Sequence, residues 1–141
     1  MKRENVVKHF GIAFLAAVIL YLVSFYGIEH MRTRKGGWQV SFQTDAAGTP
    51  RLIISQPRIG ISNVTLDFPD QRIGQTNFGS SVVFDQPITN VPFGRVVYLD
   101  TTFLPGSIVF ELFGHQIQLL PRVLMVDRKE MPWRSGMTLR L

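Results

Sequence analysis

The sequence has 141 residues, a formal net charge of +5 and no cysteine. The lack of cysteine excludes disulfide bonds, thiolate nucleophiles and cysteine-ligated metal sites. Residues 1–35 contain six basic and two acidic residues, whereas residues 36–141 contain nine and eight. A nucleic-acid-binding domain would concentrate positive charge on its folded surface. We therefore expect no nucleic-acid partner.

Residues 10–28 form an apolar stretch of 19 residues without a charge. As an α-helix this stretch would be about 28 Å long, close to the hydrocarbon thickness of a bilayer. Bulky residues such as Phe25 and Tyr26 stand where a signal peptide would need small residues for cleavage. The sequence therefore predicts one uncleaved transmembrane helix, preceded by a basic tail (residues 1–9) and followed by a basic juxtamembrane linker (residues 29–37).

Basic residues flank this helix on both sides, where we expect them to contact lipid headgroups. Three lie on each side, so the positive-inside rule does not choose an orientation. A Met-Lys-Arg start before a first apolar segment is typical of a signal anchor, which leaves the N-terminus in the cytoplasm. We expect a single-pass protein of the cell (inner) membrane with a periplasmic or extracellular domain. The headgroup contacts are expected from Lys2, Arg3, Lys8, Arg32, Arg34 and Lys35.

Small residues recur along one face of the predicted helix with 4-3-4-3 spacing. Small side chains let a second helix approach closely in lipid. This pattern predicts a helix-packing face, although six of the 19 residues are small and chance could produce such a stripe. The sequence leaves open whether the face pairs with itself or with another protein. The face consists of Ala13, Ala17, Leu20, Ser24 and Gly27.

After Gly36-Gly37 the hydrophobic pattern changes from continuous to alternating, which is typical of half-buried strands. Turns are expected at residues 45–48, at 104–107 as a type II turn, and at Gly114-His115. Residues 74–81 and 129–136 are expected as loops, the first of them mobile. This spacing predicts an all-β, antiparallel, sandwich-like domain over residues 38–141, with a C-terminal meander. The expected strands are residues 38–43, 51–55, 63–68, 82–85, 96–103, 108–113, 116–120, 123–126 and 137–141.

No pattern of residues points to catalysis. His115 is the single histidine of the β domain and is expected in a turn with its ring in solvent. Walker A, GxSxG and HExxH motifs are absent. Carboxylate pairs could in principle serve a glycosidase, but their separation cannot be read from sequence. We predict no enzyme and no catalytic, cofactor or metal site.

Aromatic and apolar residues in expected turns are the candidates for partner contacts. Phe103 and Leu104 form an apolar tip beside the Pro-Gly turn, and exposed tips of this kind often insert into a partner. The alternative is that Leu104 folds back onto the core. Trp133 could supply an aromatic platform for a sugar, or it could cover the open end of the sandwich.

These observations lead to a functional hypothesis and two alternatives. The hypothesis is a non-enzymatic accessory or assembly subunit of a larger membrane complex, for example a respiratory or photosynthetic one. Its helix would pack in the bilayer and its β domain would dock on the exported face. The first alternative is a membrane-anchored binding module for a cell-envelope glycan or another exported ligand. The second is an enzyme, which would need convergent polar side chains in one pocket.

Overall fold

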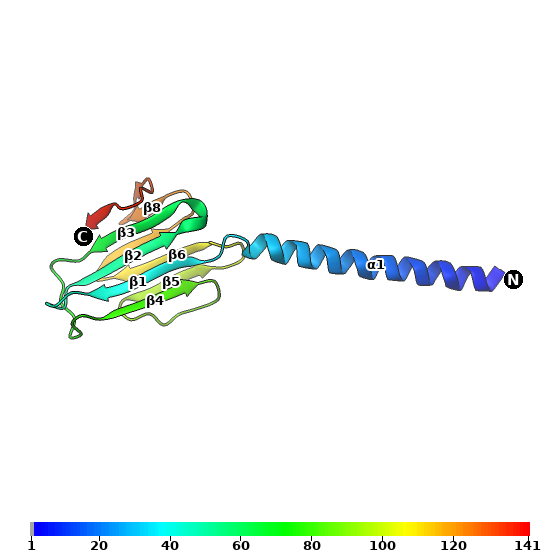
Figure 1. Ribbon diagram of the computed structural model, residues 1–141, viewed down its shortest axis with the longest axis horizontal. Coiled ribbons are helices and arrows are strands. Elements are labelled where there is room, and N and C mark those ends of the chain that lie inside the picture. Colours follow the sequence, from blue (N-terminus) through cyan, green and yellow to red (C-terminus); the bar gives the residue numbers. More distant parts are fainter. Residues whose placement is uncertain (1) are drawn as a thin grey trace. The chain divides into compact units, whose positions relative to one another are not determined.

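The computed structural model describes residues 2–141, with side chains described from Asn5 onward, and divides into two compact units, Met1–Arg34 and Lys35–Leu141 (Figure 1). The first unit is a single helix, α1 (Lys2–Thr33). Its segment Asn5–Thr33 has a mean hydropathy of 2.2 and is long and apolar enough to cross a membrane. The protein thus has one such helix within the described residues.

Helix α1 extends beyond the apolar stretch at both ends. At its C-terminal end Arg32 donates to Glu29 one turn earlier, with Nη2 2.7 Å from Oε1. Side chains three apart on a helix are neighbours, so this pair favours continuation of the helix into the basic flank. The non-helical connection to the second unit is consequently shorter than the linker expected from the sequence.

The first sheet of the second unit contains five strands in the order β10-β3-β2-β1-β4. All neighbours are antiparallel except β10, which runs parallel to β3. A short 3-10 helix, η1 (Pro57–Ile59), joins β2 to β3. The strands are β1 (Trp38–Thr44), β2 (Pro50–Gln56), β3 (Ile61–Asp67), β4 (Gly79–Phe84) and β10 (Thr138–Arg140).

The second sheet is a meander in which five consecutive strands pair in chain order. This arrangement confirms the predicted all-β domain with a C-terminal meander. After β9 the chain leaves this sheet and returns to the first sheet as β10. The strands are β5 (Arg95–Asp100), β6 (Ser107–Leu112), β7 (His115–Leu119), β8 (Leu124–Val126) and β9 (Lys129–Met131).

One hydrophobic core lies between the two sheets. Strands β1 and β2 alternate buried and more exposed residues along their whole length, as a sheet with one buried face requires. Phe110 of β6 meets Phe42 and Phe84 of the other sheet in edge-to-face contacts, with ring centroids 6.3 and 5.5 Å apart. Aromatic pairs of this geometry stabilise the packing of one sheet on the other.

Some boundaries differ from the sequence prediction. Strand β4 begins at Gly79, so residues 79–81 form a strand and not part of a loop. The reason is pairing with β1, where Ser81 lies opposite Ser41 and the two hydroxyl oxygens are 2.7 Å apart. Strand β9 lies in the segment expected as a loop, and β5 ends at Asp100, before the expected residue 103. Tertiary pairing overrides local preference in each case.

Candidate functional site

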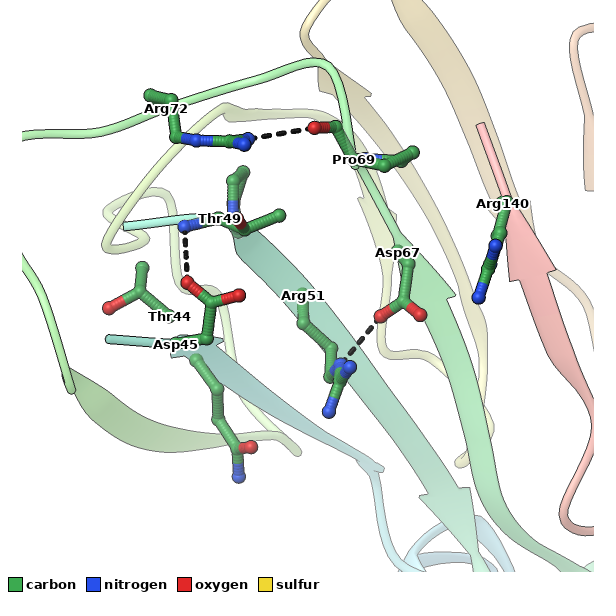
Figure 2. Close-up of a pocket in the computed structure, with 10 residues that line it drawn as sticks. Thr44, Asp45, Thr49, Arg51, Asp67, Pro69, Arg72 and Arg140 are labelled. Carbon is green, nitrogen blue, oxygen red and sulfur yellow. Dashed lines mark hydrogen bonds and ion pairs between the residues drawn. The ribbon is translucent and has the colours of Figure 1, made fainter. Parts of the chain in front are cut away.

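A polar pocket of about 350 Å³ opens at one end of the first sheet. It is formed by the end of β1, the start of β2, the end of β3, strand β10 and the loop between β3 and β4 (Figure 2). Most of its lining is polar or charged, and three of the side chains are arginines. The lining residues are Gln43, Thr44, Asp45, Thr49, Pro50, Arg51, Asp67, Pro69, Arg72 and Arg140.

The register of the sheet brings charged residues of alternating sign together. Arg51 of β2 lies opposite Asp67 of β3, and Asp67 lies opposite Arg140 of β10. Paired residues on neighbouring strands project from the same face, so the two guanidinium groups flank one carboxylate (Figure 2). Arg51 Nε donates to Asp67 Oδ1 at 2.5 Å. The guanidinium of Arg140 makes no hydrogen bond or ion pair with the described residues.

Backbone hydrogen bonds hold the β3–β4 loop beside the pocket. Ile73 N donates to Gly48 O at 2.9 Å, and Asn77 N donates to Asp45 O at 3.0 Å. Gly48 has a φ of +79°, and a Cβ added there would lie 2.5 Å from Ile73 O. Only glycine fits this close approach without strain. The docked loop carries Arg72 to the mouth of the pocket.

The side chain of Arg72 is held by its own loop. Its Nη1 donates to the carbonyl oxygens of Pro69 and Gln71, each at 2.7 Å. These bonds occupy one nitrogen and leave the other guanidinium N–H groups available. Arg72 is therefore oriented by the protein and can still bind a ligand.

The carboxylate of Asp45 closes the β1–β2 turn. Its Oδ1 accepts from Thr49 N and Ala47 N, both at 2.9 Å. The hydrogen bond from the Thr49 backbone, followed by that from Ala47 and the positive charge of Arg72, holds the pKa of Asp45 below its usual value of 3.8. Asp45 is thus ionised at neutral pH and is engaged by its turn. The pocket contains three guanidinium groups and two carboxylates, an excess of one positive charge.

This arrangement is suited to binding an anion. Guanidinium groups bind the oxygen atoms of carboxylates and phosphates through paired hydrogen bonds. The hydroxyl of Thr44 accepts a hydrogen bond from Phe78 N at 2.9 Å, which connects it to the backbone at the start of β4. Nucleophilic catalysis by a hydroxyl needs an adjacent base such as histidine. The described residues that line the pocket include no histidine.

His115, which the sequence predicts to be a turn residue, forms a hydrogen bond with an aspartate. Its Nδ1 lies 2.6 Å from Asp127 Oδ2, and Asp127 Oδ1 accepts from Gln116 N at 2.9 Å. These bonds, led by the one from His115, hold the pKa of Asp127 below 3.8. His115 is the first residue of β7 and not part of the turn expected from the sequence, so the pair joins the start of β7 to the β8–β9 turn. The hollow beside His115 is lined, among the described residues, by no serine or threonine.

A second surface feature lies along one edge of the sandwich. Strands β4 and β5 are the outer strands of their sheets and lie at the same edge (Figure 1). All four large hydrophobic side chains that the described domain exposes are on these strands or in the turn after β5. They are Val83 (45% exposed), Val97 (50%), Tyr98 (56%) and Phe103 (61%).

The expected partner contacts are only partly exposed. Phe103 is at the surface, but Leu104 is 7% exposed and packs inward. Trp133 is half-buried, its ring centroid is 5.2 Å from that of Trp38, and its Nε1 donates to Leu120 O at 2.8 Å. Of the three residues, Phe103 is thus the most exposed, whereas Leu104 follows the alternative of folding back into the domain. The backbone turns inward after Phe103, and the indole of Trp133 finds its hydrogen-bond partner inside.

The expected helix residues all lie on α1 and are exposed within that unit. This holds for the whole expected packing face of Ala13, Ala17, Leu20, Ser24 and Gly27. Among the expected headgroup contacts, Lys8, Arg34 and Lys35 are exposed and Arg32 is half-buried. The side chains of Lys2 and Arg3 lie outside the described residues.

Sequence reasoning missed the arginine pocket. Arg51 and Asp67 stand at alternating positions of predicted strands, so their outward orientation could have been read from the pattern. Their partner Arg140 could not, because the parallel pairing of β10 with β3 joins residues far apart in the chain.

The fold and these surfaces define a small two-sheet β domain attached to one apolar helix long enough to span a membrane. The chain matches no known protein-family pattern, no curated protein and no solved structure.

Proposed function

We propose that this protein is a non-enzymatic accessory or assembly subunit of a larger membrane protein complex. The observation that carries the proposal is that every large apolar side chain exposed by the described domain belongs to one of two outer strands, β4 and β5, or to the turn after β5. Apolar side chains concentrated on one surface favour association with another protein. We call this surface, with Val83, Val97, Tyr98 and Phe103, the apolar edge.

The four outer strands of the sandwich differ in how they are protected against pairing. Strands β9 and β10 have three residues each and contain charged side chains. Strand β5 begins and ends with charged residues and has a register shift between Val96 and Tyr98. Strand β4 has six residues and no charge, and none of the described strands pairs with its outer side. Charges, bulges and short lengths are the usual protections of sheet edges.

Strand β4 is therefore the outer strand that best accepts a strand from a partner. Its residues are small or apolar, so a neutral extended segment could add to the sheet through backbone hydrogen bonds. The partner of the apolar edge is thus an extended, uncharged segment of another subunit. Phe103 adds an apolar contact beside this edge.

In the bilayer, helix α1 anchors the subunit, with its N-terminus in the cytoplasm and its β domain on the exported side of the cell membrane. Lipid headgroups contact the basic flanks, including Lys8 and Arg34. The small-residue face of α1 packs against a helix of the complex or against a second copy. The alternative of a glycan-binding aromatic platform gains no support from Trp133, which is half-buried against Trp38.

The test is extraction of the native protein in mild detergent, affinity purification and mass spectrometry of the proteins recovered with it. We expect stoichiometric membrane partners. Val83→Lys should reduce their recovery, because a lysine on β4 hinders strand addition. Gln39→Lys is the matched control, since Gln39 lies opposite Val83 on the same face but on an inner strand. Equal recovery with both variants would contradict docking at the apolar edge.

The helix is tested in the same experiment. Replacing Ala13 and Ala17 together by leucine should weaken partner recovery, because larger side chains separate packed helices. Val18→Leu, on another face of α1, is the control for added bulk. A protein that purifies alone, with and without these changes, would refute the accessory-subunit proposal.

A further inference from the structure

We propose that the arginine-lined pocket at the end of the first sheet binds the phosphate group of a phosphomonoester. The pocket is separate from the apolar edge, and the proposal does not depend on the accessory-subunit function. It rests on three guanidinium groups from three chain segments, β2, the β3–β4 loop and β10, that border one cavity (Figure 2).

Each guanidinium has N–H groups available for a ligand. Arg51 is bonded to Asp67 through Nε, which orients the group and leaves its two terminal nitrogens open. Arg72 is bonded through Nη1 to two backbone carbonyls, which leaves Nε and Nη2. The guanidinium of Arg140 has no partner among the described residues. The pocket thus combines two pre-oriented arginines with one that is unpaired.

The number of available guanidinium N–H groups favours a phosphate over a single carboxylate. Asp67 offsets one arginine and Asp45 is engaged by the backbone of its own turn. A phosphomonoester carries a charge of about −1.5 to −2 near neutral pH and has three terminal oxygens. It can therefore accept hydrogen bonds from arginines on several sides. A planar carboxylate has two oxygens and one charge, so it would engage fewer of them.

The pocket also has room for the group that carries the phosphate. Its volume is about 350 Å³, several times larger than a phosphate needs. The lining beyond the arginines contains the amide of Gln43 and the hydroxyl of Thr49, which already donates to Asp45. The amide can donate to and accept from hydroxyls, and the Thr49 oxygen can still accept. The ligand class is accordingly a phosphorylated polyol, either soluble or as the headgroup of a lipid.

The test uses the full chain in an uncharged maltoside detergent and follows backbone amide resonances near the pocket by NMR. Glycerol phosphate and inorganic phosphate are the soluble probes, and acetate is the planar control anion. A parallel sample contains micelles doped with short-chain phosphatidic acid. This second arm distinguishes a lipid headgroup from a soluble phosphate.

We expect saturable shifts at the amides of Gly48 and Thr49 with a phosphate probe and much weaker shifts with acetate. Arg72→Gln and Arg140→Gln should each weaken binding about tenfold, the value of one hydrogen bond to a charged group. Arg122→Gln, an exposed arginine outside the pocket, should leave affinity unchanged. All three side chains are exposed, so their replacement is compatible with folding.

Saturable binding in either arm that is weakened to this extent in the two pocket variants would establish the site and its source of ligand. The absence of saturable shifts with glycerol phosphate, inorganic phosphate and phosphatidic acid would overturn the proposal. Equal weakening by Arg122→Gln would also overturn it, since that result would show unspecific attraction to positive charge. None of these outcomes alters the partner test of the apolar edge, so the two proposals fail separately.

Discussion

The side-chain amide of Gln56 donates a 2.9 Å hydrogen bond to the carbonyl oxygen of Gly37, at the beginning of the β domain. The same nitrogen reaches Gly36 O at 2.9 Å, while Gln56 Oε1 accepts from Arg58 N at 3.2 Å. Gln56 is 1% exposed. One buried polar side chain on β2 therefore satisfies backbone groups from both the first residues of the domain and the turn after β2.

Replacement of Gln56 should be costly for this reason. Gln56→Ala leaves buried backbone groups without partners, and we expect the free energy of unfolding to fall by at least about 2 kcal/mol. Urea unfolding of the full chain in detergent, followed by tryptophan fluorescence, measures this change, because both tryptophans lie in the sandwich. Gln39→Ala, at an exposed position of β1, should change stability by less than about 0.5 kcal/mol. A similar loss of unfolding free energy in Gln56→Ala and Gln39→Ala would contradict the role assigned to Gln56.

Gly48 is expected to resist substitution. Gly48→Ala would place a Cβ 2.5 Å from Ile73 O in a backbone with φ +79°. The left-handed conformation alone costs about 1 kcal/mol for alanine. Relief of the clash should also weaken the Ile73 N to Gly48 O hydrogen bond. We expect lower stability and faster hydrogen exchange at the Ile73 amide.

Gly74→Ala is the matched control for this loop. Gly74 has open space around its Cβ position and no positive φ. Its replacement should leave both stability and exchange at Ile73 nearly unchanged. If the Ile73 amide exchanged as slowly in Gly48→Ala as in Gly74→Ala, the position of the loop would not depend on the close approach at Gly48.

The Asp127 carboxylate should make stability depend on acid pH. Hydrogen bonds from His115 and then from the Gln116 backbone lower its folded-state pKa below the usual 3.8. A lowered folded pKa adds stability above about pH 4 that is lost as pH falls through the folded value. Asp127→Asn should therefore reduce stability at neutral pH and flatten its decline in acid. Unfolding measured from neutral pH to about pH 2 gives both quantities.

The control for this effect is Asp85→Asn. The Asp85 side chain is exposed and makes no hydrogen bond with the described residues. This change should preserve the acid dependence of the unmodified protein. An identical pH profile for the Asp127 variant and the unmodified protein would show that the His115–Asp127 contact contributes nothing to folding.

Phe103 and Leu104 are adjacent in sequence but should respond oppositely to substitution. Leu104 is 7% exposed, so Leu104→Ala should lower stability by about 2–4 kcal/mol through a lost core contact. Phe103 is 61% exposed, so Phe103→Ser should change stability by less than about 0.5 kcal/mol. Phe103→Ser should instead reduce recovery of membrane partners. A large loss of stability from Phe103→Ser would show that its ring belongs to the core.

Much of the architecture follows from local pattern. The uncharged stretch of residues 10–28 specifies an apolar helix long enough to cross a membrane, and the alternation of β1 and β2 requires one buried sheet face. The turns at Asp45–Gly48 and at Phe113–Gly114 are likewise indicated by local residues, because Gly48 and Gly114 tolerate positive φ and the Asp45 side chain closes its own turn. These features depend on residues that are neighbours in the chain.

The candidate site depends instead on residues that are distant in the chain. Arg51, Asp67 and Arg140 meet because β10 returns from the second sheet and pairs with β3. Exposure of the uncharged strand β4 was likewise decided by which strands became inner and which outer. Alternation specifies that a residue faces outward, but strand order decides which charges share that face. The sequence by itself determined the apolar helix and the β class, and the long-range pairing of strands determined the pocket and the apolar edge.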